Sequence, residues 1–304
     1  MSRTETTTGT GAAAARGAAT LLRGGMPGTR VWRVLGGEST ATGELRQVTD
    51  HLEAGADVPT ALAAADGPEW RVLAAAWSIA EVTGAAFAPV LERLADALVA
   101  LERLAERRAV LVSGPRATIR LVAALPLLSL LLGVILGFDP IGVFLSPIGA
   151  VIAVAGCALL ALGVRWAHLL TARLADAAWV AGLECELTWI AISAGSSPAD
   201  AMRRVVDHTD AARAEWVRFA ELRRNGAVSR VLRAAARAGT PAGALLLAEA
   251  DAARARAMTE LETAAEQLGV RMLLPIAACV LPSFVLLGVV PVLIAVLGSL
   301  QLAA

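Results

Sequence analysis

Three long stretches without a charged residue constrain this 304-residue chain more than any other feature. They cover residues 121–138, 140–164 and 272–304. A helix needs about 18 to 20 apolar residues to cross the hydrocarbon core of a bilayer, and each stretch reaches that length. We therefore predict an integral membrane protein, with a transmembrane hairpin over residues 119–165 and a C-terminal transmembrane helix over residues 271–304.

The composition favours an all-α fold. Hydrophobic residues make up 57% of the chain and the mean hydropathy is +0.63, whereas soluble domains have about 45–50% apolar residues. Ala and Leu, both strong helix formers, dominate, and residues typical of strands are sparse. Every basic residue is Arg. A P-loop ATPase needs a Lys at the nucleotide phosphates, so the absence of Lys excludes that class.

The residue types that usually bind metals or catalyse reactions are scattered. The cysteines and histidines are Cys157, Cys185, Cys279, His51, His168 and His208. Their spacing matches no metal site. An intramembrane aspartyl peptidase needs two aspartates at membrane level, and only Asp139 lies near an uncharged stretch. We expect no metal, no cofactor and no enzymatic activity, and the zero net charge argues against nucleic-acid binding.

The arginines predict the orientation in the membrane. They flank the uncharged stretches at Arg103, Arg107, Arg108, Arg116, Arg120, Arg165, Arg173, Arg254, Arg256 and Arg271. The short loop of the hairpin has no Arg, and none follows the third stretch. Because basic residues stay on the cytosolic side, we expect a multi-pass protein of the inner (cytoplasmic) membrane with a cytosolic N-terminus and an extracytoplasmic C-terminus.

The remaining segments divide into a tail and two cytosolic modules. Residues 1–42 are rich in Thr, Gly, Ala and Arg with little periodicity, which predicts a disordered tail; an alternative is a helix whose arginines touch anionic lipid. There is no pattern of a cleavable signal peptide. Residues 43–118 and 166–270 are predicted to be helical modules, because apolar residues recur there at helical spacing.

The two modules look like copies of one unit. Turn and helix-start residues match in the same order along the chain: Gly55, Pro59, Gly84 and Pro126 in the first half, and Gly195, Pro198, Gly239 and Pro282 in the second. A Gly that ends a helix, with a Pro shortly after it, is typical of a tight helix–helix turn. The difference in residue number between matched positions grows along the chain, and an extra helical piece near residues 213–225 would account for this growth.

The end of the chain carries a family resemblance. The stretch Gly269-Val-Arg-Met-Leu-Leu-Pro-Ile-Ala-Ala-Cys-Val-Leu-Pro-Ser-Phe-Val-Leu-Leu-Gly-Val-Val-Pro291 resembles the type II secretion system F family, and residues 189–205 look like the start of a family domain. Residues 114–118 and 137–140 are also similar to the family. The resemblance covers about residues 43–300 and is closest to the tight-adherence (Flp pilus) branch. That branch usually divides the two domains between two proteins, whereas here they are fused.

The resemblance implies an inner-membrane platform for a type II secretion or pilus-assembly machine. Its implied partners are a cytosolic secretion ATPase, a pilin or pseudopilin and further platform subunits, in a homo- or hetero-oligomer within the lipid bilayer. We name Glu92, Glu102 and Glu249 as a possible partner face. The alternatives are a small transporter or channel component and a membrane enzyme; against transport, the spans carry no charge at mid-membrane.

Overall fold

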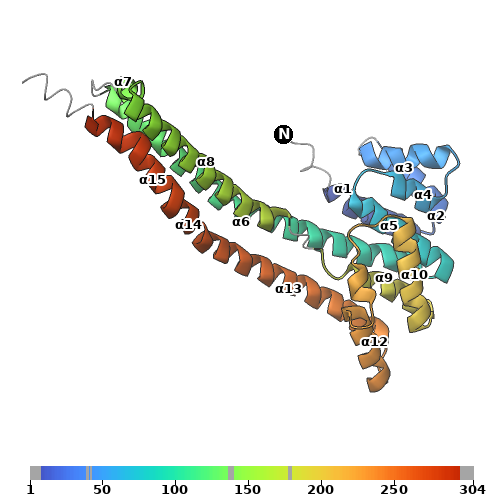
Figure 1. Cartoon of the computed structure of the whole chain (residues 1–304). Helices are drawn as coiled ribbons and strands as arrows, with labels where there is room; N and C mark the ends of the chain where they lie inside the picture. Colours follow the sequence, from blue (N-terminus) through green and yellow to red (C-terminus); the bar gives the residue numbers. More distant parts are fainter. Residues whose placement is uncertain (1–7, 39–40, 42, 136–139, 177–179, 295–304) are drawn as a thin grey trace, which may run out of the picture. The chain divides into compact units, whose positions relative to one another are not determined.

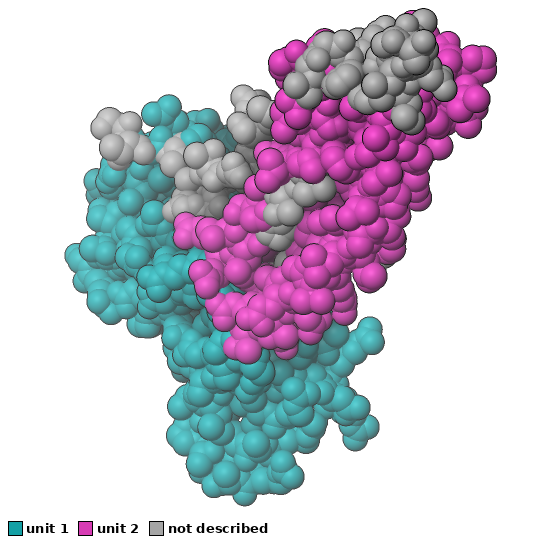
Figure 2. All heavy atoms as spheres, turned by 90° about the vertical axis from the view of Figure 1, so that its left-hand side faces the viewer, with its two compact units in different colours: residues 1–105, 178–258 teal, residues 106–177, 259–304 magenta. Residues whose placement is uncertain are grey.

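The computed structural model describes residues 8–38, 41, 43–135, 140–176 and 180–294. These residues form helices and no strand (Figure 1), so the predicted all-α class is confirmed. The chain divides into two compact units, coloured separately in Figure 2. Unit 1 contains residues 1–105 and 178–258, and unit 2 contains residues 106–177 and 259–304.

Unit 1 is built from short helices and the beginnings of two long ones. Its elements are α1 (Thr8–Arg23), α2 (Gly28–Gly36), α3 (Gly43–Glu53), α4 (Val58–Ala64), α5 (Pro68–Thr83), the start of α6 (Phe87–Ile135), α9 (Leu183–Ser193), α10 (Pro198–Ala211), α11 (Phe219–Leu222), α12 (Ala227–Ala238) and the start of α13 (Ala242–Arg271). Local sequence explains the boundaries. Asp57 and Ser197 accept hydrogen bonds from backbone N–H groups in the first turns of α4 and α10. Gly84 and Gly239 end α5 and α12 in the left-handed conformation, with φ of 77° and 63°.

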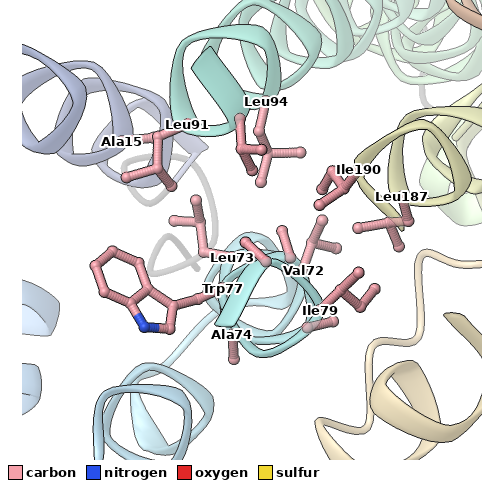
Figure 3. Packing of buried hydrophobic residues seen from close by; sticks show 14 of the residues in the cluster. Ala15, Val72, Leu73, Ala74, Trp77, Ile79, Leu91, Leu94, Leu187 and Ile190 are labelled. Atoms are coloured by element: carbon pink, nitrogen blue, oxygen red, sulfur yellow. The ribbon is translucent and has the colours of Figure 1, made fainter. Parts of the chain in front are cut away.

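Helix α5 lies at the centre of the unit 1 core. Its side chains Leu73 and Ile79 are fully buried. Ala15 of α1, Leu91 and Leu94 of α6, and Leu187 and Ile190 of α9 surround it (Figure 3). The two segments predicted as separate cytosolic modules therefore contribute to one hydrophobic core.

The N-terminal segment differs from the disordered tail predicted for residues 1–42. Helices α1 and α2 are ordered over most of that segment and belong to the core of unit 1. Trp32 of α2 is fully buried, with its ring centroid 5.7 Å from that of Trp77 and 6.4 Å from that of Trp70, both in α5. The prediction was wrong for two reasons. The buried residues of α1 are alanines, which do not mark a helix face in the sequence, and α2 packs through the contact of Trp32 with a helix later in the chain.

Unit 2 contains the apolar helices. Its elements are the rest of α6, α7 (Pro140–Phe144), α8 (Pro147–Asp176), the rest of α13, α14 (Leu273–Pro275), the π-helical turn η1 (Ile276–Val280), α15 (Leu281–Phe284) and a second π-helical turn, η2 (Val285–Val289). The helical stretches Phe87–Ile135, Pro147–Ala172 and Ala242–Ile294 are each long and apolar enough to cross a membrane, which confirms the three predicted spans. Leu127 in the first of these stretches and Ile148 in the second expose 70% and 74% of their surface, as lipid-facing side chains do. Asp139, named in the sequence analysis, lies outside the described residues.

Candidate interaction site

A buried carboxylate in unit 1 binds the two long helices together. Glu186, in the first turn of α9, is only 2% exposed. Its two oxygens accept hydrogen bonds from Arg93 Nε of α6 at 3.0 Å each, and Oε1 accepts a further one from Arg254 Nη2 of α13 at 2.6 Å. Asp251 completes the cluster, because Oδ1 lies 2.7 Å from Arg93 Nη2 and 2.9 Å from Arg254 Nη1.

This Glu186 cluster connects the two helices that continue into apolar spans. Helices α6 and α13 both continue along the chain into membrane-spanning stretches. Glu186 therefore joins the unit 1 ends of the two span-bearing helices through charge-assisted hydrogen bonds, which are stronger than neutral ones. Sequence analysis missed this cluster, because the partners of Glu186 lie 93 and 68 positions away.

A second buried carboxylate lies beside the first. Burial raises the pKa of Glu184, although hydrogen bonds from the backbone N–H and the side chain of Arg218 counteract this rise. These bonds attach the loop before α11 to α9. Between the two carboxylates, burial raises the pKa of Cys185 to about 12, so this thiol stays protonated and unreactive.

A polar pair lies in a cavity between α4, α5 and α10. The cavity has a volume of about 300 Å³ and is lined by residues that include Asp57, Ser78 and His208. Ser78 Oγ and His208 Nδ1 are hydrogen-bonded over 2.8 Å, and burial lowers the pKa of His208, which favours the neutral imidazole. Within the described part of the chain, no carboxylate hydrogen-bonds to this imidazole. A serine nucleophile needs a base that is itself oriented by a third group, so the pair is best interpreted as a link between α5 and α10.

No metal-binding group of three or more His, Cys, Asp or Glu side chains occurs among the residues that the structure describes. Unit 2 instead shows close packing through small residues. A Cβ atom on Gly156 of α8 would lie 2.5 Å from Leu287 Cγ, and one on Gly288 of η2 would lie 2.2 Å from Ser129 Oγ of α6. Glycine at these positions lets the spans approach closely, as is common between membrane helices.

The predicted turn residues lie at helix boundaries or within spans. Gly55, Gly84, Gly195 and Gly239 all have positive φ and follow the ends of α3, α5, α9 and α12. Pro59 and Pro198 lie in the first turns of α4 and α10. Pro126 lies inside α6, and Pro282 follows the π-helical turn η1 at the start of α15.

The packing favours a different first match for the repeat. Helix α9 contacts α12, and Glu186 links it to α13; in the same way α1 contacts α5, and it is ion-paired to α6 through Arg16 and Asp96. Helix α1 is followed by Gly25, which has a φ of 85°, and by Pro27. From these contacts we propose the α1–α2 turn at Gly25, rather than the turn at Gly55, as the counterpart of the α9–α10 turn at Gly195.

Two of the three glutamates named as a partner face are paired within the chain. Glu92 forms an ion pair with Arg23, and Glu249 forms one with Arg256 at 2.6 Å. Glu102 is part-buried, with its Oε1 atom enclosed. A partner would have to compete for the first two carboxylates, so they are poor choices for a free charged surface.

Comparison with known proteins locates the family resemblance in the first half of the chain. The matched segment runs from within α1 to the end of α6, so it includes residues 14–42 of the predicted disordered tail and the first span. It does not include residues 166–270, where the family domain was expected. The chain matches no curated protein. Residues 14–135 match the model of the family described as Type II secretion system (T2SS), protein F.

Proposed function

We propose that the chain is an inner-membrane platform protein of a type II secretion or tight-adherence (Flp) pilus-assembly machine. The family match over residues 14–135 carries this proposal. The three apolar helices and the helical unit 1 supply the two parts that such a platform needs: an anchor in the bilayer and a folded surface for partners. The first half of the chain would be one platform domain, and the second half would be a copy of it.

The proposed mechanism is transmission of a displacement. Because the chain has no Lys and so no P-loop, the energy has to enter through a partner ATPase that binds unit 1. The Glu186 cluster would keep α6 and α13 in register, so that a push on unit 1 moves the cytosolic ends of both helices together. The spans would in turn hold the pilin or pseudopilin in the membrane, and further platform copies would complete the assembly.

The test uses the full chain in nanodiscs and a purified secretion ATPase encoded in the same genome. We expect binding that weakens with salt, because charged faces meet, and faster ATP hydrolysis on binding. Absence of binding at low salt with nucleotide present would contradict the platform function.

A matched pair of variants tests the coupling step. Glu186→Gln removes a buried charge that faces two guanidinium groups, at a cost of about 3 kcal/mol. Glu249→Gln removes an outer ion pair worth about 1 kcal/mol or less. We expect Glu186→Gln to keep ATPase binding, measured below its lowered melting temperature, but to reduce pilin assembly in cells. Equal assembly in the two variants would show that the Glu186 cluster is not part of the coupling.

A further inference from the structure

A group of arginines in unit 1 has no carboxylate partner. Arg223, Arg224, Arg230, Arg233 and Arg237 are exposed and lie in or just before α12. None of them forms an ion pair in the described structure, whereas Arg93 and Arg254 are both ion-paired to Glu186. We call these five residues the α12 arginine patch. The nearest acidic residue in sequence, Glu221, forms no ion pair with them in the described structure, and its Oε2 accepts a hydrogen bond from Ala227 N at 3.0 Å.

The patch borders an apolar groove between α10 and α12. The groove has a volume of about 490 Å³, and its lining includes Met202, Leu222 and Leu232. Arg224 and Arg233 line it as well. Arg233 Nη1 donates to the carbonyl oxygen of Arg224 at 2.6 Å, which holds this guanidinium at the groove while leaving its positive charge uncompensated.

We propose that this groove binds an acidic amphipathic segment of a partner protein. An apolar side chain such as Leu or Phe would fill the groove, and flanking Asp or Glu side chains would pair with Arg224 and Arg233. Arginine presents its donors in a fork that matches a carboxylate, so the expected contacts are bidentate. This inference goes beyond the proposed function, since it specifies the chemistry of one contact and holds for whichever protein supplies the segment.

The shape of the site favours a protein segment over the other anionic partners. The groove lining contains no aromatic side chain on which a nucleic-acid base could stack. An amphipathic helix that binds a lipid surface inserts protruding apolar side chains, whereas the large apolar side chains of α12 are buried or half-buried. A hollow flanked by guanidinium groups instead matches the helix-in-groove mode of peptide recognition.

The test measures binding of a fluorescent peptide of about four helical turns, with Leu at positions i, i+3, i+4 and i+7 and Glu elsewhere. The protein is the full chain in nanodiscs of zwitterionic lipid. We expect micromolar binding at about 50 mM salt that weakens as the salt concentration rises. Arg224→Gln/Arg233→Gln should weaken binding about tenfold, which corresponds to about 1.4 kcal/mol. The control Arg30→Gln/Arg46→Gln removes the same charge from exposed arginines of α2 and α3 and should bind like the wild type.

A second pair of variants tests the groove itself. Ala236 lines the groove and is exposed, so Ala236→Trp should fill it and weaken binding. Ala234→Trp adds the same side chain to an exposed position of α12 outside the groove lining and should not. Equal affinity for all variants, or no binding to the wild type, would overturn the proposal.

Preferential binding to vesicles of anionic phosphatidylglycerol or to a single-stranded oligonucleotide, lost in Arg224→Gln/Arg233→Gln, would also overturn the proposal in favour of that ligand. The ATPase experiment uses a different partner, so either result stands without the other.

Discussion

At the scale of single residues, Glu69 is the most unusual group in unit 1. It is 2% exposed at the start of α5, and its Oε1 atom has no hydrogen-bond partner in the described structure. Gly11 and Gly67 lie against its side chain. Burial is the main cause that raises the pKa of Glu69, and Glu44 and Glu102 raise it further. A buried carboxyl of this kind is most easily accommodated in its protonated form.

We therefore predict that Glu69→Gln stabilises the protein at alkaline pH. The pKa of Glu69 in the folded state lies above its value in the unfolded state. The contribution of the Glu69 carboxyl to the free energy of unfolding is therefore complete below about pH 4, and it is lost as the pH rises through the folded-state pKa. The variant should melt about 2 °C or more above the wild type at about pH 8 and at the same temperature near pH 4. Circular dichroism of the detergent-solubilised chain measures this. Glu53→Gln, at an exposed position of α3, is the control, and an equal gain in that variant would contradict the argument.

At the scale of helices, η2 lies close against α6 in unit 2. A Cβ atom built on Gly288 would lie 3.1 Å from Ser129 Cβ. This distance is a few tenths of an ångström shorter than the Cβ–Cβ separation of about 3.5–4.5 Å found in disulfides, so a small backbone shift would accommodate the bond.

We predict that Ser129→Cys/Gly288→Cys forms a cross-link within one chain. The background should carry Cys157→Ala, Cys185→Ala and Cys279→Ala, so that only the new pair reacts. After mild oxidation in membranes, the cross-linked chain should show a mobility shift on non-reducing gels. Leu127 is exposed, so Leu127→Cys/Gly288→Cys serves as the control and should not cross-link within the chain. Efficient cross-linking of the control alone would contradict the described packing.

At the scale of the whole molecule, the orientation in the membrane remains a prediction from the arginines. Alkaline phosphatase is active only outside the cytosol. Fusions after Ser146, in the hairpin, and after Gln301 should therefore be active, and a fusion after Gly182 should be inactive. Immunoblots must show equal amounts of the three fusions. The reverse pattern of activity would contradict the topology.

The parts that sequence could predict are those determined by local or environmental rules. The spans were predictable because the bilayer demands a fixed length of apolar helix, and the helix ends because Gly and Pro act on their immediate neighbours. The helical structure of α1 and α2 could not be predicted, because it depends on the contact of Trp32 with Trp70 and Trp77 in a later helix. The Glu186 cluster and the α12 arginine patch could not be predicted either. Whether an arginine forms an ion pair depends on which distant carboxylates the fold brings close to it.

The discontinuous composition of unit 1 determines when it can be completed during synthesis. Residues 1–105 leave the ribosome first, but α9 and Glu186 belong to the second stretch, residues 178–258. At about 5 to 20 residues per second, the roughly 150 intervening and completing residues take about 8 to 30 s. During that interval the first two spans enter the membrane while Leu91, Leu94 and Arg93 lack α9. The nascent first half thus exposes the apolar face of Leu91 and Leu94 and the unpaired charge of Arg93. This is the stage of synthesis at which a chaperone would be needed most.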